Sequence, residues 1–180
     1  MPRVRTQNAI GNANPRLAGF SLVEILVVVM VLMIIAAIAI PNLVHGKMRA
    51  NEASAVASVK TINTAEYMYN TSYPEVGYSS SLATLGSNGS TCETPSSTNA
   101  CLIMDEALTS GIKSGYIFEI VGDGNKPAIA YTVNAAPESA VSGRCSISSS
   151  QSGEVHIAGP GAPSSGGDKS VGAGGSDGCE

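Results

Sequence analysis

Charged and aromatic residues are scarce in this sequence. Charged side chains make up 13% of its 180 residues, against about 25% in an average soluble domain. Aromatic residues make up 4%, with two Phe and no Trp, so a large pocket walled by aromatic rings is not expected. The two histidines, His45 and His156, stand far apart in the sequence and are too few for a histidine-based metal site.

Catalytic and nucleotide-binding motifs are absent as well. The sequence contains no HExxH, GxSxG, P-loop or GxGxxG pattern. No nucleophile can be paired with a general base by its position in the sequence. We therefore expect neither an enzymatic activity nor a bound cofactor or metal ion.

The few charges are unevenly distributed. The first 19 residues contain Arg3, Arg5 and Arg16 and no acid, whereas the whole chain has a formal net charge of −4. The body of the chain is therefore distinctly acidic. A basic leader, an apolar segment and an acidic body indicate export rather than nucleic-acid binding, so no nucleic-acid partner is expected.

A long apolar run follows the basic leader. Residues 25–40 are all apolar, and between Phe20 and Ile40 only Ser21 and Glu24 are polar. About 20 apolar residues in a helix can cross a bilayer, while an ordinary secretory signal has an apolar core of roughly 7–15 residues. A plain membrane anchor leaves Glu24 unexplained, because an ionisable group is costly inside a membrane and usually has a function.

The residues around Glu24 form a recognisable pattern. Residues 16–24 read RLAGFSLVE, the apolar run follows at once, and Pro41 comes directly after it. This segment closely resembles the N-terminus of type IV pilins and pseudopilins. The resemblance implies that a prepilin peptidase cleaves the leader after Gly19 and that Phe20 becomes the N-methylated first residue. It also implies that Glu24 and Pro41 occupy the acidic and helix-kinking positions of the family.

The resemblance further implies a structural role, as a subunit of a type IV pilus-like filament. The partners would be further copies of the chain, the prepilin peptidase, and the pilus or secretion assembly platform. The precursor would lie in the bacterial inner membrane, and the mature subunit in an extracellular pilus or a periplasmic pseudopilus. The terminal amine of Phe20 would pair with Glu24 of a neighbour, since a buried charge is tolerated only when it is paired. A type II secretion pseudopilin is the alternative within the family.

Two alternatives from other classes remain open on the sequence. One is a secreted binding protein or enzyme whose signal is cleaved after Ala39. The other is an uncleaved single-pass protein that presents a small binding head. Both alternatives predict that replacing Glu24 has no effect, which separates them from a filament subunit.

After Pro41 the pattern becomes amphipathic. Apolar residues recur at helical spacing with polar residues between them: Val56, Val59 and Ile62 against Glu52, Lys60 and Glu66. We expect one helix over about residues 21–70, kinked at Pro41, whose second half packs on a sheet. The tyrosines of this region are expected to serve as core and as cover for that sheet: Tyr67, Tyr69, Tyr73 and Tyr78.

Short alternating runs after residue 110 predict antiparallel strands. The clearest are residues 116–121 and 128–133, separated by a Gly/Asp/Asn turn. Weaker strand candidates are residues 144–148 and 155–158, and short helical turns are expected near 82–85 and 103–108. The predicted fold class is α+β and pilin-like, with a long N-terminal helix packed on a small antiparallel sheet.

The chain is accordingly divided into four parts. Residues 1–19 form the cleaved leader, and residues 20–41 the transmembrane and polymerisation helix. Residues 42–158 form the amphipathic helix and the globular head. Residues 159–180 form a tail rich in Gly and Ser, which is expected to be flexible.

The four cysteines predict disulfides in an oxidising compartment. Four cysteines allow three pairings. Cys92 and Cys101 enclose a short Pro/Ser/Thr loop, so local pairing is the preferred interpretation. Cys145 would then pair with Cys179 and tie the tail to the sheet, as a C-terminal pilin disulfide does. The absence of a CxxC motif disfavours a redox site.

Residues 123–125 allow two interpretations, a calcium site or a turn. Asp123 and Asn125 carry oxygen ligands of the kind that calcium prefers. The Asp-Gly-Asn sequence is also ordinary turn chemistry, and the turn is the favoured interpretation. The adjacent acids Asp105 and Glu106 are expected on a solvated face.

Overall fold

The computed structural model describes residues 20–87, 92 and 94–159. The predicted leader, residues 1–19, and almost all of the predicted tail, residues 160–180, lie outside the described residues. The chain divides into two compact units, Met1–Ile40 and Pro41–Glu180. The helix α1 (Leu22–Ser72) belongs to both units.

The long helix predicted for residues 21–70 is confirmed. The carbonyl of Ser21 accepts the N–H groups of Glu24 and Ile25 at 3.1 and 3.3 Å, so the backbone turns into the helix at this residue. Pro41 lies inside α1, where it removes one N–H donor from the helical ladder.

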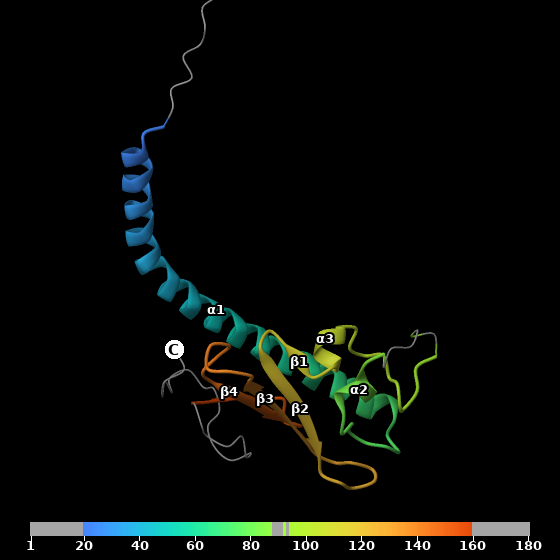
Figure 1. The fold of residues 1–180 in the computed structure, drawn as a ribbon. Coiled ribbons are helices and arrows are strands. Elements are labelled where there is room, and N and C mark those ends of the chain that lie inside the picture. Colours follow the sequence, from blue (N-terminus) through green and yellow to red (C-terminus); the bar gives the residue numbers. More distant parts are fainter. Residues whose placement is uncertain (1–19, 88–91, 93, 160–180) are drawn as a thin grey trace, which may run out of the picture. The chain divides into compact units, whose positions relative to one another are not determined.

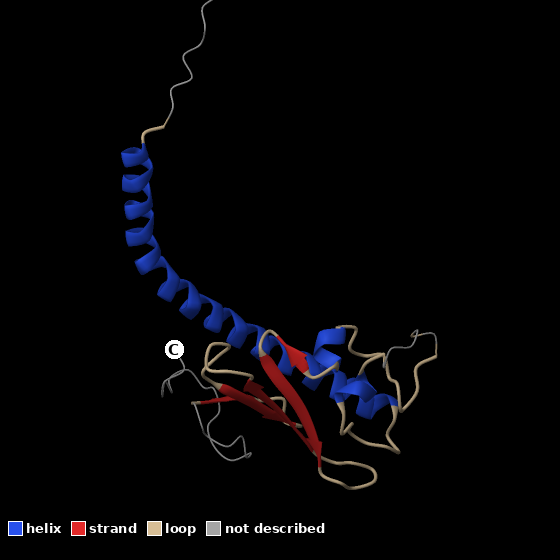
Figure 2. Ribbon diagram, in the orientation of Figure 1, coloured by secondary structure: helices blue, strands red, loops and turns tan. Residues whose placement is uncertain are grey.

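The second half of α1 carries a buried stripe. Its members are spaced three and four residues apart, as one face of an α-helix requires: Ala55, Ser58, Val59, Ile62, Ala65, Glu66 and Tyr69. This stripe packs on the sheet in a single hydrophobic core, and Figure 2 shows the strands lying beside this part of the helix.

The sheet is a meander of five antiparallel strands in the order β1-β2-β3-β4-β5. The strands are β1 (Ile112–Lys113), β2 (Tyr116–Gly122), β3 (Tyr131–Pro137), β4 (Ser146–Ser150) and β5 (Val155–Ala158). Alternate residues of β2, β3 and β4 are buried, because successive side chains of a strand point to opposite faces. Figure 1 shows β2, β3 and β4 side by side. The predicted α+β, pilin-like fold class is therefore confirmed.

The predicted hairpin is present, but its second strand starts later than the sequence indicated. The ladder begins at the pair Gly122–Tyr131, so the connection covers residues 123–130 instead of the predicted 122–127. The carboxylate of Asp123 organises this loop by accepting the N–H groups of Asn125 and Ile129, both at 3.1 Å. Pro127 within the loop has no N–H to offer to a ladder.

The remaining short elements also differ in detail from the prediction. β4 begins two residues after the predicted start, β5 has the predicted bounds, and the two-residue β1 was not predicted. The helix α2 (Leu82–Leu85) is confirmed, whereas α3 (Glu106–Thr109) is shorter than the predicted turn. Asp105 explains the difference, because its side chain accepts the N–H groups of Ala107 and Leu108 and caps the start of α3.

Asp105 is therefore more than a solvated surface acid. Its carboxylate also lies 2.8 Å from the Lys113 ammonium on β1. The hydrogen bond from Lys113 is the main reason that the pKa of Asp105 falls below its usual value. This contact joins α3 to the first strand of the sheet.

Three of the four predicted cover tyrosines contribute to the core. Tyr69 is buried, and Tyr73 and Tyr78 are half-buried against the core. Tyr67 is 71% exposed, so its predicted role in the core is wrong. It lies on the opposite side of α1 from the buried stripe, because residues two positions apart on a helix face different directions.

The structure buries Glu66, which the sequence pattern placed among the polar residues of the helix. Its side chain is fully buried on the stripe of α1. One carboxylate oxygen, Oε2, accepts the Ser79 N–H at 2.8 Å, and Oε1 has no hydrogen-bond partner among the described residues. Burial raises the pKa of Glu66 to about 7, although the Ser79 N–H opposes this rise.

The charge of Glu66 affects the pKa of two buried tyrosines. Burial raises the pKa of Tyr69 and of Tyr131, and the Glu66 carboxylate raises the pKa of each further. None of the ion pairs formed by the described residues involves Glu66. The negative charge is thus uncompensated, which makes its burial unfavourable in the ionised form.

The burial of Glu66 predicts that the head loses stability as the pH rises. The carboxyl titrates near 4.5 in the unfolded chain and near 7 in the folded one, so the folded state binds more protons between these values. The free energy of unfolding should therefore fall with rising pH across this window and stay low above it, by on the order of 3 kcal/mol. The measurement is urea unfolding of the full chain in detergent micelles between about pH 4 and pH 8.

The Glu66→Gln variant should lose most of this pH dependence. The exposed Glu75 supplies the control, since Glu75→Gln should keep the wild-type slope. Equal slopes in wild type and Glu66→Gln would contradict the assignment.

Candidate functional site

Phe20 and Glu24 lie about one helical turn apart at the start of α1. The Phe20 side chain is 76% exposed, and Glu24 is an exposed acid in the first turn of the helix. Neither ion pair formed by the described residues involves Glu24. Within the described part of one chain, the Glu24 carboxylate thus has no cation partner.

The helix that follows Glu24 exposes apolar side chains in every direction. Between residues 22 and 40 all side chains are exposed except Ala36, which is half-exposed. In the described part of the chain, α1 is the one helix long and apolar enough to cross a membrane. A carboxylate near the end of such a segment is stabilised when a cation from another chain reaches it.

A second set of contacts fastens a loop of the head to α1. The Asn51 side-chain amide donates to the Ser142 carbonyl at 2.8 Å. The Arg144 N–H donates to Glu52 Oε1 at 2.9 Å. We call these two hydrogen bonds the loop clamp. They join residues that are 91 and 92 positions apart in the sequence, so no local sequence pattern predicted them.

The loop clamp ends at Cys145, where a strand residue completes it. The hydroxyl of Tyr116 on β2 donates to the Cys145 carbonyl at 2.9 Å. A Cβ at Gly143 would lie 2.2 Å from this hydroxyl, so only glycine fits beside the ring. The start of β4 is therefore fixed by contacts to both α1 and β2.

The predicted local disulfide is present. Cys92 and Cys101 are bonded, and their Cα atoms lie 5.8 Å apart. The enclosed loop is held to the head from both sides: the Tyr69 hydroxyl donates to the Ser97 carbonyl at 2.5 Å, and the Cys101 N–H donates to the Gly86 carbonyl at 3.1 Å.

Cys145 is disulfide-bonded as well. Its predicted partner, Cys179, lies outside the described residues. The pairing of Cys145 with Cys179 therefore stays a prediction.

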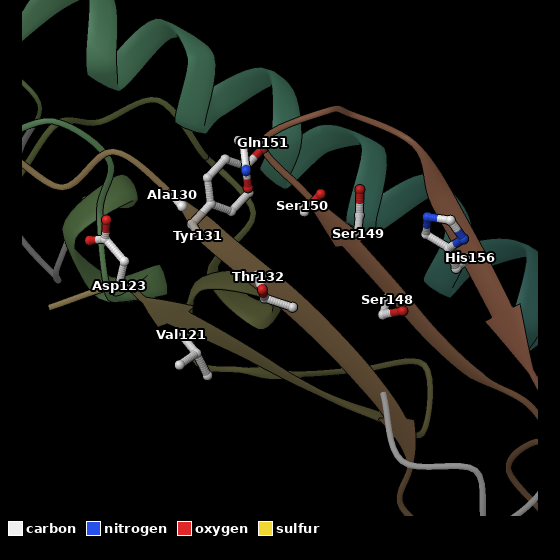
Figure 3. Close-up of a pocket in the computed structure, with 11 residues that line it drawn as sticks. Val121, Asp123, Ala130, Tyr131, Thr132, Ser148, Ser149, Ser150, Gln151 and His156 are labelled. Atoms are coloured by element: carbon white, nitrogen blue, oxygen red, sulfur yellow. The ribbon is translucent and has the colours of Figure 1, made fainter. Parts of the chain in front are cut away.

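An open groove of about 530 Å³ lies at one end of the sheet. Figure 3 shows that its wall is built from the end of β2, β3, β4 and β5, with Asp123 at one end and His156 at the other. The Ser149 hydroxyl in this wall accepts from the Asn63 amide at 2.7 Å and donates to the Glu154 carbonyl at 2.6 Å. Its hydrogen bonds thus join α1, β4 and the β4–β5 connection.

The structure supports the turn interpretation of Asp123 over a calcium site. Asp123 Oδ1 accepts from the Asn125 N–H, and Oδ2 accepts from the Asn125 amide and the Ile129 N–H. These hydrogen bonds, led by that from the Asn125 side chain, lower the pKa of Asp123. Among the described residues, no group of three His, Cys, Asp or Glu side chains is placed to hold a metal ion.

The family comparison bears on the N-terminal end of α1. Residues 15–40 match the model of the prokaryotic N-terminal methylation motif. This chain carries a prepilin-type N-terminal methylation motif. The motif covers the exposed Phe20, Glu24 and the apolar part of α1 up to Ile40.

The curated proteins that resemble the chain include type II secretion system core proteins and a type IV pilin. The type II secretion system core protein G of Pectobacterium carotovorum subsp. carotovorum is 37% identical over 71 residues, which are 38% of this chain and 46% of that protein. The type IV major pilin protein PilA of Myxococcus xanthus (strain DK1622) is 39% identical over 57 residues, 32% of this chain and 26% of that protein.

A third similar protein has the same name as the first. The type II secretion system core protein G of Aeromonas hydrophila is 37% identical over 62 residues, 33% of this chain and 43% of that protein. The chain thus spans less than half the length of each of these relatives. No solved structure matches the chain at a significant level.

The predicted site residues fall into two groups. Phe20 and Glu24 lie together within the matched motif, whereas Pro41 lies just after it on the same helix. Gly19 lies outside the described residues. Sequence reasoning missed the loop clamp and the buried Glu66, whose only signal was the spacing of Glu66 four residues after Ile62 on the apolar stripe.

We expect the Cys92–Cys101 disulfide to contribute measurably to the stability of the head. Replacing both cysteines by serine should lower the free energy of unfolding by about 2–3 kcal/mol, because the unfolded chain regains the entropy of a loop of this length. The measurement is urea unfolding of the oxidised protein. The exposed Thr94 in the same loop provides a control, since Thr94→Ala should leave the midpoint in place. An unchanged midpoint in the double cysteine variant would refute the prediction.

Proposed function

We propose that this chain is a structural subunit of a type IV pilus-like filament, without catalytic activity of its own. A prepilin peptidase cleaves the precursor after Gly19, and the new N-terminal Phe20 is N-methylated. The precursor resides in the bacterial inner membrane with its arginine-rich leader on the cytoplasmic side, as the positive-inside rule requires. The mature subunit is then assembled into a filament by a dedicated platform.

The unpaired Glu24 at the start of an exposed apolar helix is the observation that carries this proposal. An apolar helix exposed on all sides is stable in a bilayer or in contact with other such helices. A carboxylate in that setting favours a cationic partner, and cleavage after Gly19 creates one at Phe20. The amine of one subunit would then meet Glu24 of its neighbour and fix the axial register of the two helices.

A type II secretion pseudopilin is the second candidate. The matches to the two type II secretion core proteins cover 46% and 43% of those proteins, whereas the match to the pilin covers 26% of it. The larger share of the type II secretion proteins that is matched supports this second candidate. The two disulfide-bonded regions of the head favour a pilin that is exposed outside the cell.

Cleavage after Gly19 is tested by mass spectrometry of the N-terminal peptide, from protein expressed in its own cell envelope. N-methylated Phe20 as the first residue is the expected result. Ile40 as the first residue would identify the apolar run as an ordinary secretory signal. An intact Met1 would identify a plain membrane anchor, and either finding would overturn the proposal.

The Glu24→Ala variant should abolish most filament formation while leaving membrane insertion unchanged. Insertion depends on the apolar run, which the variant retains, whereas register depends on the missing carboxylate. Sheared filaments are quantified by electron microscopy and immunoblotting, and insertion by resistance of the membrane-bound protein to carbonate extraction.

Glu75→Ala is the matched control, because it removes an exposed acid of the head and should leave the filament yield unchanged. Normal filaments in the Glu24→Ala variant would rule out the pairing of Glu24 with the terminal amine.

A further inference from the structure

Two cations stand where α1 leaves the apolar run. Lys47 and Arg49 are both exposed, and no Asp or Glu occurs anywhere between Glu24 and Glu52. We call Lys47 and Arg49 the basic collar. The collar contrasts with the chain as a whole, in which 14 acidic residues outnumber 10 basic ones.

The basic collar lies on the two flanks of α1, beside the line of residues that packs on the head. Met48, between the two cations, is half-buried and lies seven residues before Ala55 of the buried stripe, so it faces nearly the same side of the helix. At about 100° per residue, Lys47 and Arg49 project to the two flanks of this line. No atom lies within 4 Å of a Cβ built on Gly46, so the surroundings of this turn are open.

The nearest acid on the helix does not neutralise the collar. Glu52 follows Arg49 by three residues, a spacing that allows an ion pair. Its Oε1 accepts the backbone N–H of Arg144 instead, which directs this carboxylate to the loop clamp. Neither ion pair formed by the described residues involves Lys47 or Arg49.

We propose that the basic collar binds the phosphate groups of anionic lipids at the outer surface of the membrane that the apolar helix spans. Lys and Arg have apolar stems and charged ends, which allows them to lie along a helix and reach the headgroup layer. The collar follows the apolar run within a few residues on the same helix, the position at which interfacial cations are placed. It offsets the repulsion between an acidic head and an anionic surface. The inference rests on the membrane-anchored state within the proposed function.

Lipid headgroups fit the basic collar better than a protein surface does, because the two cations lie on different flanks of the helix. A ring of lipids can reach both flanks at once, whereas a single acidic patch on a second copy faces one. The acidic surface of a neighbouring head is therefore the competing occupant, which the experiment below distinguishes.

The test is electron spin resonance of labelled lipids around the full chain, purified as dispersed subunits and placed in phosphatidylcholine bilayers. Spin-labelled phosphatidylglycerol should associate with the protein about two- to fivefold more strongly than spin-labelled phosphatidylcholine. This preference should fall close to one in the Lys47→Gln/Arg49→Gln variant, and should weaken in wild type as salt is raised, because salt screens exposed charges.

Two further variants make the result specific. Lys47→Arg/Arg49→Lys keeps both charges and should retain the preference. Lys60→Gln removes an exposed cation farther along α1 and should also retain it. Equal association of both lipids with wild type would overturn the proposal. A preference that survives Lys47→Gln/Arg49→Gln, together with loss of filaments in that variant, would assign the collar to a second copy of the chain and also overturn it.

The outcome is independent of filament assembly. Lipid association is measured on dispersed subunits, and the N-terminus of the same sample is read by mass spectrometry. Failure of cleavage after Gly19 would therefore leave the lipid preference in place, and loss of the preference would leave the cleavage in place.

Discussion

The rest of the structure depends on one constraint: the two halves of the helix α1 must be stable in different surroundings. The N-terminal half of α1 exposes apolar side chains in all directions, while its second half buries one stripe and exposes the remainder. A continuous helix satisfies its own backbone hydrogen bonds, so it can pass from hydrocarbon to water without a break. The surroundings of each half are then decided by side chains alone.

The head is built around the second half of this helix. Three strands of the meander, β2, β3 and β4, place alternate buried residues against the stripe, and polar side chains of α1 reach across to the sheet. The Tyr131 hydroxyl donates to Asn63 at 3.1 Å, and Asn63 in turn donates to Ser149 at 2.7 Å. Together with the loop clamp, these hydrogen bonds fix the orientation of the sheet on the helix.

Several polar side chains of the described head join neighbouring elements of the fold, whereas the Glu24 carboxylate at the start of α1 forms no ion pair with any described residue. Asp105, Asp123 and Ser149 cap, bridge or fasten neighbouring elements. Glu24 has no such contact to a cation in the described residues. This contrast is the reason that the proposed assembly contact is assigned to the N-terminal end of the helix.

Glu66 is the exception within the head. A fully buried acid with one unpartnered oxygen lowers stability when it ionises. It also supplies the one side-chain acceptor for the Ser79 N–H, which holds the segment after α1 against the helix. The same group thus fastens a connection and makes the head sensitive to pH.

The sequence by itself determined the features that rest on local pattern. The RLAGFSLVE segment, the unbroken apolar run, the alternation in β2 and the short spacing of Cys92 and Cys101 are read from neighbouring residues, and each was confirmed by the motif match or by the structure. Periodicity and spacing report the backbone state of a segment directly.

Only the tertiary structure decided the features that join distant segments. The burial of Glu66, the loop clamp and the late start of β3 depend on partners that approach in the folded chain, and the clamp contacts are 91 and 92 residues apart in sequence. A polar residue at helical spacing looks the same in sequence whether it faces water or a neighbouring loop. The difference arises from packing, because burial is a property of the assembled surface rather than of any one segment.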